Sequence, residues 1–135
     1  MTFFDELLNS FCAEAGVDYA LVAKSQRDHP GYFRILACSN GSAALGSQSF
    51  EIAGSLFETV IAKGEFVADA GAQGRFPNDG VLKHFNAQAC VGLVVQARNG
   101  DGVIAVLHES AMAAPEVIKG RLKKFAARPS FNLEI

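Results

Sequence analysis

The sequence predicts a three-layer α+β domain, in which helices cover both faces of a central, mostly antiparallel sheet of about five to six strands. Two observations carry this prediction. Helical and strand-like segments alternate along the chain, and the two longest apolar runs do not alternate cleanly, which is typical of strands buried on both faces. A length of 135 residues suits one domain, and we expect residues 1–135 to form it.

The composition narrows the class of protein. Half of the residues are hydrophobic, 19% are charged and the formal net charge is −2, which excludes a disordered chain and gives no basic surface for nucleic acid. No apolar run reaches the ~20 residues that span a bilayer, and Asp5 and Glu6 stand where a signal peptide carries positive charge. We therefore expect a cytoplasmic protein with reduced thiols, no nucleic-acid partner and no membrane insertion.

The first half of the chain reads as one helix and three strands. A helix is expected over Phe3–Ala15, because its apolar residues recur at helical spacing and Gly16 suits the left-handed residue that ends a helix. The strands follow over Tyr19–Ser25, over Tyr32–Cys38 and, more weakly, over Gln48–Ile52.

Another helix and a short strand follow. The helix is expected over Ser55–Ala62, where Ser55 and Glu58 form a capping box and Gly64 ends the helix. The strand is expected over Phe66–Ala68 and leads into a glycine-rich loop.

The last third reads as a brief helix, a hairpin and a final helix. The brief helix is expected over Val81–Phe85, and the hairpin strands over Ala89–Ala97 and Val103–Leu107. The final helix begins at Pro115, a favoured first position, and its basic residues are expected to form a solvated face. Pro129 is expected to end or kink it.

The spacing of the glycines in Gly100-Asp101-Gly102 matches that of a dinucleotide-binding fingerprint. That fingerprint requires a strand followed by a helix, and here the glycines lie between two predicted strands. We therefore interpret them as part of a hairpin turn.

The histidines and cysteines show no metal-ligand spacing. His29 and His108 are expected to be exposed, whereas His84 is expected to flank a pocket. Cys90, in an apolar strand, is expected to act as a small buried hydrophobe, and Cys12 to lie on a helix flank.

Nearly the whole chain resembles a bacterial GAF domain, most strongly from Phe50 to Arg128. The resemblance depends on motifs whose order and spacing are moderately specific, and these motifs fall on Gly54–Val60, Asp69, Phe76-Pro77-Asn78-Asp79, Leu82, Gly92, Asp101-Gly102 and Phe125-Ala126-Ala127-Arg128. The sequence departs from the family pattern at four positions, which are Leu56, Phe57, Val94 and Ala105.

The resemblance implies a non-catalytic sensory domain with a ligand cavity between one sheet face and the segment from Asp69 to Asn86. The candidate ligand-binding residues are Asp69, Arg75, Phe76, Asp79, His84, Phe85 and Cys90. Phe76 and Phe85 are equally able to line the cavity or to plug it. The ligand is an unidentified small molecule, and no cofactor follows, because the patterns of cyclic-nucleotide-binding, bilin-binding and haem-binding members have no convincing match.

The resemblance also implies signalling through the terminal helices. An apolar excess along Phe3–Phe11 and Val117–Phe125 favours a two-fold homodimer through these helices. The parent protein is then expected to be a sensor histidine kinase or a diguanylate cyclase. Two alternatives stay open: a redox enzyme resembling free methionine sulfoxide reductase, which needs a reactive Cys38 or Cys90, and a degenerate GAF fold that only scaffolds a dimer.

Overall fold

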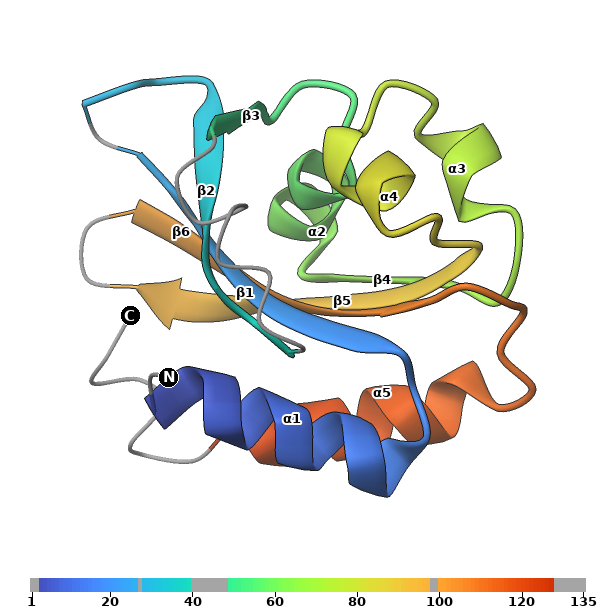
Figure 1. Cartoon of the computed structure of the whole chain (residues 1–135). Coiled ribbons are helices and arrows are strands. Elements are labelled where there is room, and N and C mark those ends of the chain that lie inside the picture. The colour runs from blue at the N-terminus through green and yellow to red at the C-terminus, as the bar shows by residue number, and fades with distance from the viewer. Residues whose placement is uncertain (1–2, 27, 40–48, 98–99, 128–135) are drawn as a thin grey trace.

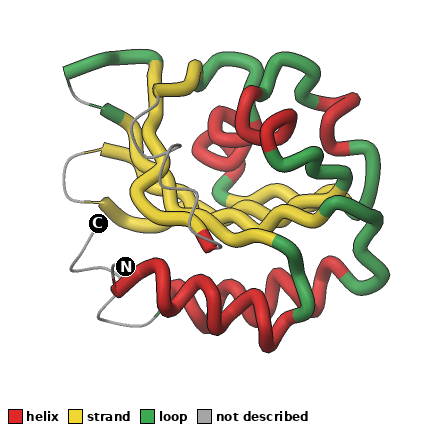
Figure 2. The backbone as a smooth tube through the Cα atoms, in the orientation of Figure 1, coloured by secondary structure: helices red, strands yellow, loops and turns green. Residues whose placement is uncertain are grey.

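The computed structural model describes residues 3–26, 28–39, 49–97 and 100–127, with the side chains of residues 3–5, 96 and 97 left out. Within these residues an antiparallel six-stranded sheet lies between two helical layers, as Figures 1 and 2 show. The predicted three-layer α+β architecture is confirmed. The expected proline stop at residue 129 lies outside the described residues.

The sheet joins the two halves of the chain at its centre. Its strands are β1 (Tyr19–Ser25), β2 (Tyr32–Cys38), β3 (Ser49–Glu51), β4 (Glu65–Ala68), β5 (Ala89–Ala97) and β6 (Gly100–His108). They lie in the order β3-β2-β1-β6-β5-β4, and every neighbouring pair is antiparallel. The central pair β1 and β6 runs from Tyr19 opposite Leu107 to Lys24 opposite Gly102.

The helices divide between the two faces of the sheet. They are α1 (Phe3–Ala15), α2 (Leu56–Lys63), α3 (Ala72–Arg75), α4 (Gly80–His84) and α5 (Pro115–Ala126). Helices α1 and α5 cover one face, and α2, α3 and α4 cover the other (Figure 1). Helix α3 was not predicted, because a four-residue helix containing Gly74 shows no apolar periodicity.

The helix boundaries follow from the local signals. Gly16 and Gly64 adopt φ values of +70° and +85°, the left-handed conformation in which glycine ends a helix at little cost. At the start of α2, the Ser55 hydroxyl accepts a hydrogen bond from the Glu58 backbone N–H at 3.3 Å. The Glu58 carboxylate accepts from the Gly54 backbone N–H, one residue before the position that a capping box requires.

The layer of α1 and α5 buries its apolar residues against its own sheet. Leu8, Phe11, Leu122 and Phe125 are each at most 6% exposed, and the Phe11 and Phe125 rings lie 5.2 Å apart. Val117 on α5 stays 56% exposed. Much of the apolar surface of α1 and α5, on which the predicted dimer depended, is therefore buried within one chain.

Strand β6 begins three residues earlier than predicted, at Gly100. Ala97 of β5 pairs with Gly100, and the Asp101 backbone N–H donates to the Ser25 hydroxyl at 2.9 Å. The glycines therefore belong to a β-hairpin and are followed by strand rather than helix, as expected, but they lie in the first residues of β6 and not in the turn itself.

Cys12 and His108 each have a hydrogen-bond partner that is distant in the sequence. Cys12 faces the sheet at 9% exposure, and its thiol donates to the Ser39 hydroxyl at 3.4 Å. The His108 side chain is 20% exposed, and its Nδ1 accepts from the Asp18 backbone N–H at 3.2 Å. The expected exposure of His108 was wrong, because Asp18, distant in the sequence, holds its ring, whereas Cys12 lies on α1 as expected, on the side that faces the sheet.

The basic face of α5 is only partly solvated. Lys119 lies 2.6 Å from one Glu65 carboxylate oxygen and Lys123 lies 3.2 Å from the other. The hydrogen bonds from Lys119 and then Lys123 lower the pKa of the Glu65 carboxyl. These contacts join α5 to the edge strand β4.

Candidate functional site

A small apolar cavity lies between the sheet and the helices α2 and α4. Its volume is about 20 Å³, enough for one water-sized molecule, whereas ligand pockets usually measure about 300–1,000 Å³. The residues that line the cavity are Leu21, Ala23, Phe33, Ile35, Leu56, Phe57, Asp79, Val81, Leu82, Val103, Ala105 and Leu107.

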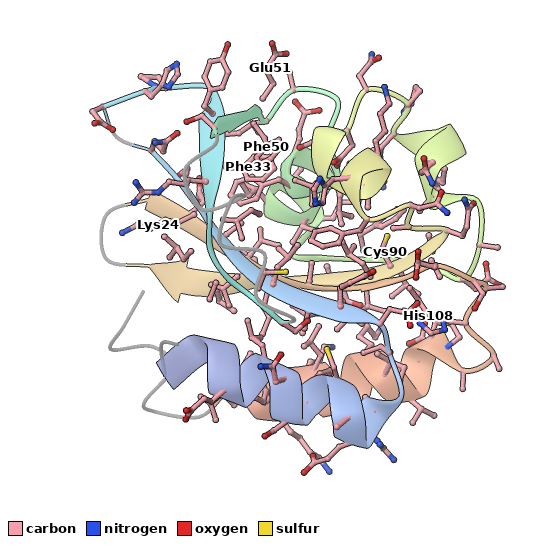
Figure 3. All side chains as sticks on the ribbon, in the orientation of Figure 1. Lys24, Phe33, Phe50, Glu51, Cys90 and His108 are labelled. Atoms are coloured by element: carbon pink, nitrogen blue, oxygen red, sulfur yellow. The ribbon has the colours of Figure 1, made fainter. Side chains whose placement is uncertain are left out.

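The floor of the cavity comes from the three strands β1, β2 and β6. Each strand contributes residues two positions apart, as for Leu21 and Ala23 of β1, because alternate side chains point to the same sheet face. Phe33 of β2 stacks on Phe57 of α2, with ring centroids 4.5 Å apart and an interplanar angle of 3°. Phe33 also lies beside Phe50 of β3, at 5.6 Å, and Figure 3 labels both.

Asp79 is the acidic residue in this lining, and it is only 4% exposed. Oδ1 accepts hydrogen bonds from the backbone N–H groups of Val81 and Leu82, at 2.9 and 3.0 Å. Oδ2 accepts from the backbone N–H of Leu56, at 2.9 Å. Asp79 therefore caps α4 and also ties α4 to the first residue of α2.

Three other candidate residues are buried on the same sheet face but do not line the cavity. Phe76 packs edge-on against Phe66 at 5.3 Å, and Phe85 packs against Tyr19 at 4.5 Å. Cys90, labelled in Figure 3, has no exposed surface, and burial raises the pKa of its thiol to about 12. The two phenylalanines thus fill space around the cavity without facing into it.

The remaining candidates Asp69, Arg75 and His84 are exposed. The Arg75 guanidinium lies over the Phe66 ring at 4.9 Å, a cation–π contact. The His84 ring meets the ring of Phe85 at 4.9 Å, edge to face. The structure therefore brings Asp79 alone of the seven candidates into the cavity lining.

Sequence reasoning missed the strand residues and the contribution of α2. The residues that line the cavity alternate along their strands, but the sequence does not reveal this because the opposite faces of the same strands are also apolar. The departures from the GAF pattern could have located the lining residues. Leu56, Phe57 and Ala105, three of the four departures from the GAF pattern, all line the cavity.

A larger hollow of about 420 Å³ opens between the end of α1 and the start of α5. The Arg121 and His108 side chains in this hollow already have partners, since Arg121 donates to the Glu14 carbonyl at 3.1 Å and the His108 Nδ1 accepts from the Asp18 backbone N–H at 3.2 Å. Within the described ranges, no group of three His, Cys, Asp or Glu side chains could hold a metal ion. In that same part of the chain, no helix combines the length and apolarity of a membrane span.

The strand order, the two helical layers and the cavity under α2 and α4 together define a GAF-like fold. Solved structures agree with this assignment. The GAF domain of a phosphoenolpyruvate-protein phosphotransferase from Acinetobacter superposes with a TM-score of 0.70 at 16% identity, over 91% of this chain and 74% of that one.

Two further solved structures show the same similarity. NreA from Staphylococcus aureus, mutated in its nitrate-binding site, has a TM-score of 0.67 at 17% identity, over 90% of this chain and 95% of that one. The GAF domain of a two-component sensor histidine kinase from Bacillus halodurans has a TM-score of 0.68 at 10% identity, over 99% of this chain and 95% of that one. No protein-family profile and no curated protein matches the sequence significantly.

Proposed function

We propose that this protein is a non-catalytic sensory domain that binds a small molecule in the cavity and signals through its terminal helices. The observation that carries the proposal is a set of backbone hydrogen bonds. They join the segment over the cavity to the chain that leads into α5. We call residues 69–88, which carry α3 and α4, the cover segment.

The cover segment is fixed at its base by three backbone hydrogen bonds. The Ala72 N–H donates to the Gln88 carbonyl at 2.9 Å and closes the segment on itself. The Gln88 N–H donates to the carbonyl of His108, the last residue of β6, at 2.8 Å. The Met112 N–H, in the connection from β6 to α5, donates to the Asp69 carbonyl at 2.9 Å.

A ligand that displaces the cover segment would therefore act directly on the chain before α5. Asp79 extends this coupling to α2, because its carboxylate binds backbone N–H groups of both α2 and α4. Ligand binding can shift a conformational equilibrium only through a difference in affinity between two states. We propose that those states are a closed cavity, as seen here, and a cavity opened by movement of the cover segment.

We further propose that the signal leaves through a homodimer, formed by the helical segments Phe3–Phe11 and Val117–Phe125. In this proposal residues 1–135 form one domain, which belongs to a cytoplasmic sensor histidine kinase or diguanylate cyclase. The similarity to the Bacillus halodurans GAF domain supports this kind of parent protein. The exposed Val117 supports a contact on the outer surface of α5. Light scattering at high micromolar concentration tests the dimer, and a monomer there would remove it from the proposal.

A dimerisation scaffold without a ligand is the second candidate. It is favoured by one observation, the cavity volume of only about 20 Å³. A redox enzyme acting through Cys38 or Cys90 is disfavoured, because Cys38 is only 5% exposed and Cys90 is fully buried. Burial also raises the pKa of the Cys90 thiol to about 12, so this thiol stays protonated at neutral pH.

A thermal-shift screen against amino acids, organic acids, nucleotides, tetrapyrroles and small aromatic molecules distinguishes the two candidates. A ligand at 100 times its dissociation constant adds about 2.7 kcal/mol of stability. The matched control is Ala105→Val, which adds two methyl groups to the cavity lining and is expected to abolish the shift. A flat response of the wild-type protein to every class would contradict the sensory function and favour the scaffold.

A further inference from the structure

We infer that Asp79 is the resident anion of this site, and that the cavity accepts an uncharged apolar molecule and excludes anions. This inference rests on the proposed function and names the ligand class of the same cavity. Three independent features of the described residues carry it: the donors around Asp79, the absence of free polar groups, and the composition of the lining.

The first feature is the convergence of three backbone donors on one carboxylate. The N–H groups of Leu56, Val81 and Leu82 come from two helices, and all lie 2.9–3.0 Å from Asp79 oxygens, although Leu56 is 23 positions from Asp79 in the sequence. Such a cluster of backbone donors is the usual protein environment for a bound anion. In this chain the anion is a side chain, so the donors are already used.

The second feature is the satisfaction of the buried polar side chains. Among the described residues, every buried side-chain nitrogen or oxygen has a hydrogen-bond partner. The carboxylate of Asp79, the polar side chain of the lining, accepts hydrogen bonds and donates none, so an anion or another acceptor entering the cavity would lose its hydrogen bonds to water without gaining a side-chain donor. A second anion would also stand close to the negative charge of Asp79, with no cationic side chain in the lining to offset it.

The third feature is the lining itself. Apart from Asp79, it consists of leucine, isoleucine, valine, alanine and phenylalanine side chains. The stacked rings of Phe33 and Phe57 offer a flat apolar wall. These surfaces favour a small hydrocarbon-like or aromatic molecule without charge, which enters as the cover segment moves.

Toluene and benzoate test the ligand class on the wild-type protein, because they share a ring and differ mainly in the carboxylate. We expect toluene to raise the melting temperature and to shift the backbone amide resonances of Leu56, Val81 and Leu82 in ¹H–¹⁵N spectra. We expect benzoate and nitrate to leave both readouts unchanged at the same concentrations. Binding of benzoate or nitrate at these amides, without binding of toluene, would overturn the inference while the proposed function stands. If no probe binds, the inferred ligand class fails, while the proposed function is decided separately by the wider thermal-shift screen.

The variant Asp79→Ala tests whether the Asp79 carboxylate occupies an anion-binding position. This test does not depend on a ligand that binds to the wild-type protein. The variant frees the three donors, so formate is expected to restore part of the lost melting temperature. Formate is expected to leave the wild-type protein and Asp79→Asn unchanged, because both keep a side chain in the anion position. If Asp79→Ala folds only with formate in the refolding buffer, that also supports the inference. An Asp79→Ala protein that responds to formate no more than Asp79→Asn does would overturn it.

Discussion

Strand β5 passes close beneath α2 at Gly92, and substitution there tests how tightly α2 packs on the sheet. Gly92 lies in the middle of β5, paired with Phe66 of β4 on one side and Ala105 of β6 on the other. A Cβ added at Gly92 would lie 2.6 Å from Cγ2 of Val60, a distance that real Cβ contacts do not reach. Because β5 is held on both sides, Gly92→Ala must push α2 away from the sheet.

The expected cost follows from that overlap. Overpacking a well-packed core by one methyl group costs about 1–3 kcal/mol. For a chain of this length, each kcal/mol lowers the melting temperature by about 3–5 °C, so we expect a fall of about 3–15 °C. The displacement also lengthens the hydrogen bond from the Leu56 N–H to Asp79, since Leu56 is the first residue of α2.

Thermal unfolding followed by circular dichroism measures the effect, and two variants serve as controls. The double variant Gly92→Ala/Val60→Ala lacks the clashing methyl groups of Val60. Its loss of unfolding free energy should therefore be smaller than the sum of the losses in the two single variants. Gly120→Ala lies in α5, where a Cβ has open space, and should stabilise the protein by about 0.5–1 kcal/mol. A melting temperature of Gly92→Ala equal to that of the wild type, or strict additivity in the double variant, would refute this account of the packing.

Three further outcomes follow from the structure. Phe57→Ala should lower the free energy of unfolding by about 3–5 kcal/mol, measured by urea denaturation, because Phe57 is buried. The cavity that it leaves should bind benzene, so benzene should raise the melting temperature of the variant more than that of the wild type. The pKa of Glu65 lies below its usual 4.5, because Lys119 and Lys123 donate hydrogen bonds to it. Its contribution to stability is therefore present above pH 4.5 and lost as pH falls through the lowered pKa, and Glu65→Gln should flatten that acid limb in denaturation curves. Cys90, with a pKa of about 12, should resist a thiol-reactive probe at pH 8 until the protein is unfolded; rapid labelling of the native protein would contradict its burial.

Most secondary structure was accessible from the sequence, because long elements carry both periodicity and stop signals. The bounds of α1, β1 and β2 agree with those predicted, and in each case polar residues or glycine mark the ends. The differences arise where tertiary contacts decide. Strand β6 includes Gly100 and Asp101 because the Ser25 hydroxyl of a neighbouring strand holds the Asp101 N–H, a contact that local turn preferences do not reveal.

Less of the candidate site than of the secondary structure could be predicted from the sequence. The sequence and the family resemblance led to a cavity under the segment from Asp69 to Asn86, and α4 of that segment does line the observed cavity. They could not show that the Asp79 carboxylate is used internally, since one of its donors, Leu56, lies 23 positions away. Nor could they separate the cavity face of β1 and β6 from the opposite face, because both faces of these strands are apolar.

The central claim is that occupancy of the cavity reaches the chain before α5 through the cover segment. The backbone N–H of Met112 reports on this directly, because it donates to the Asp69 carbonyl at 2.9 Å and lies outside the cavity lining. In a toluene titration followed by ¹H–¹⁵N spectra, we expect the Met112 amide to shift with the same dissociation constant as the Leu56 amide. A saturating shift at Leu56 with no change at Met112 would contradict the claim.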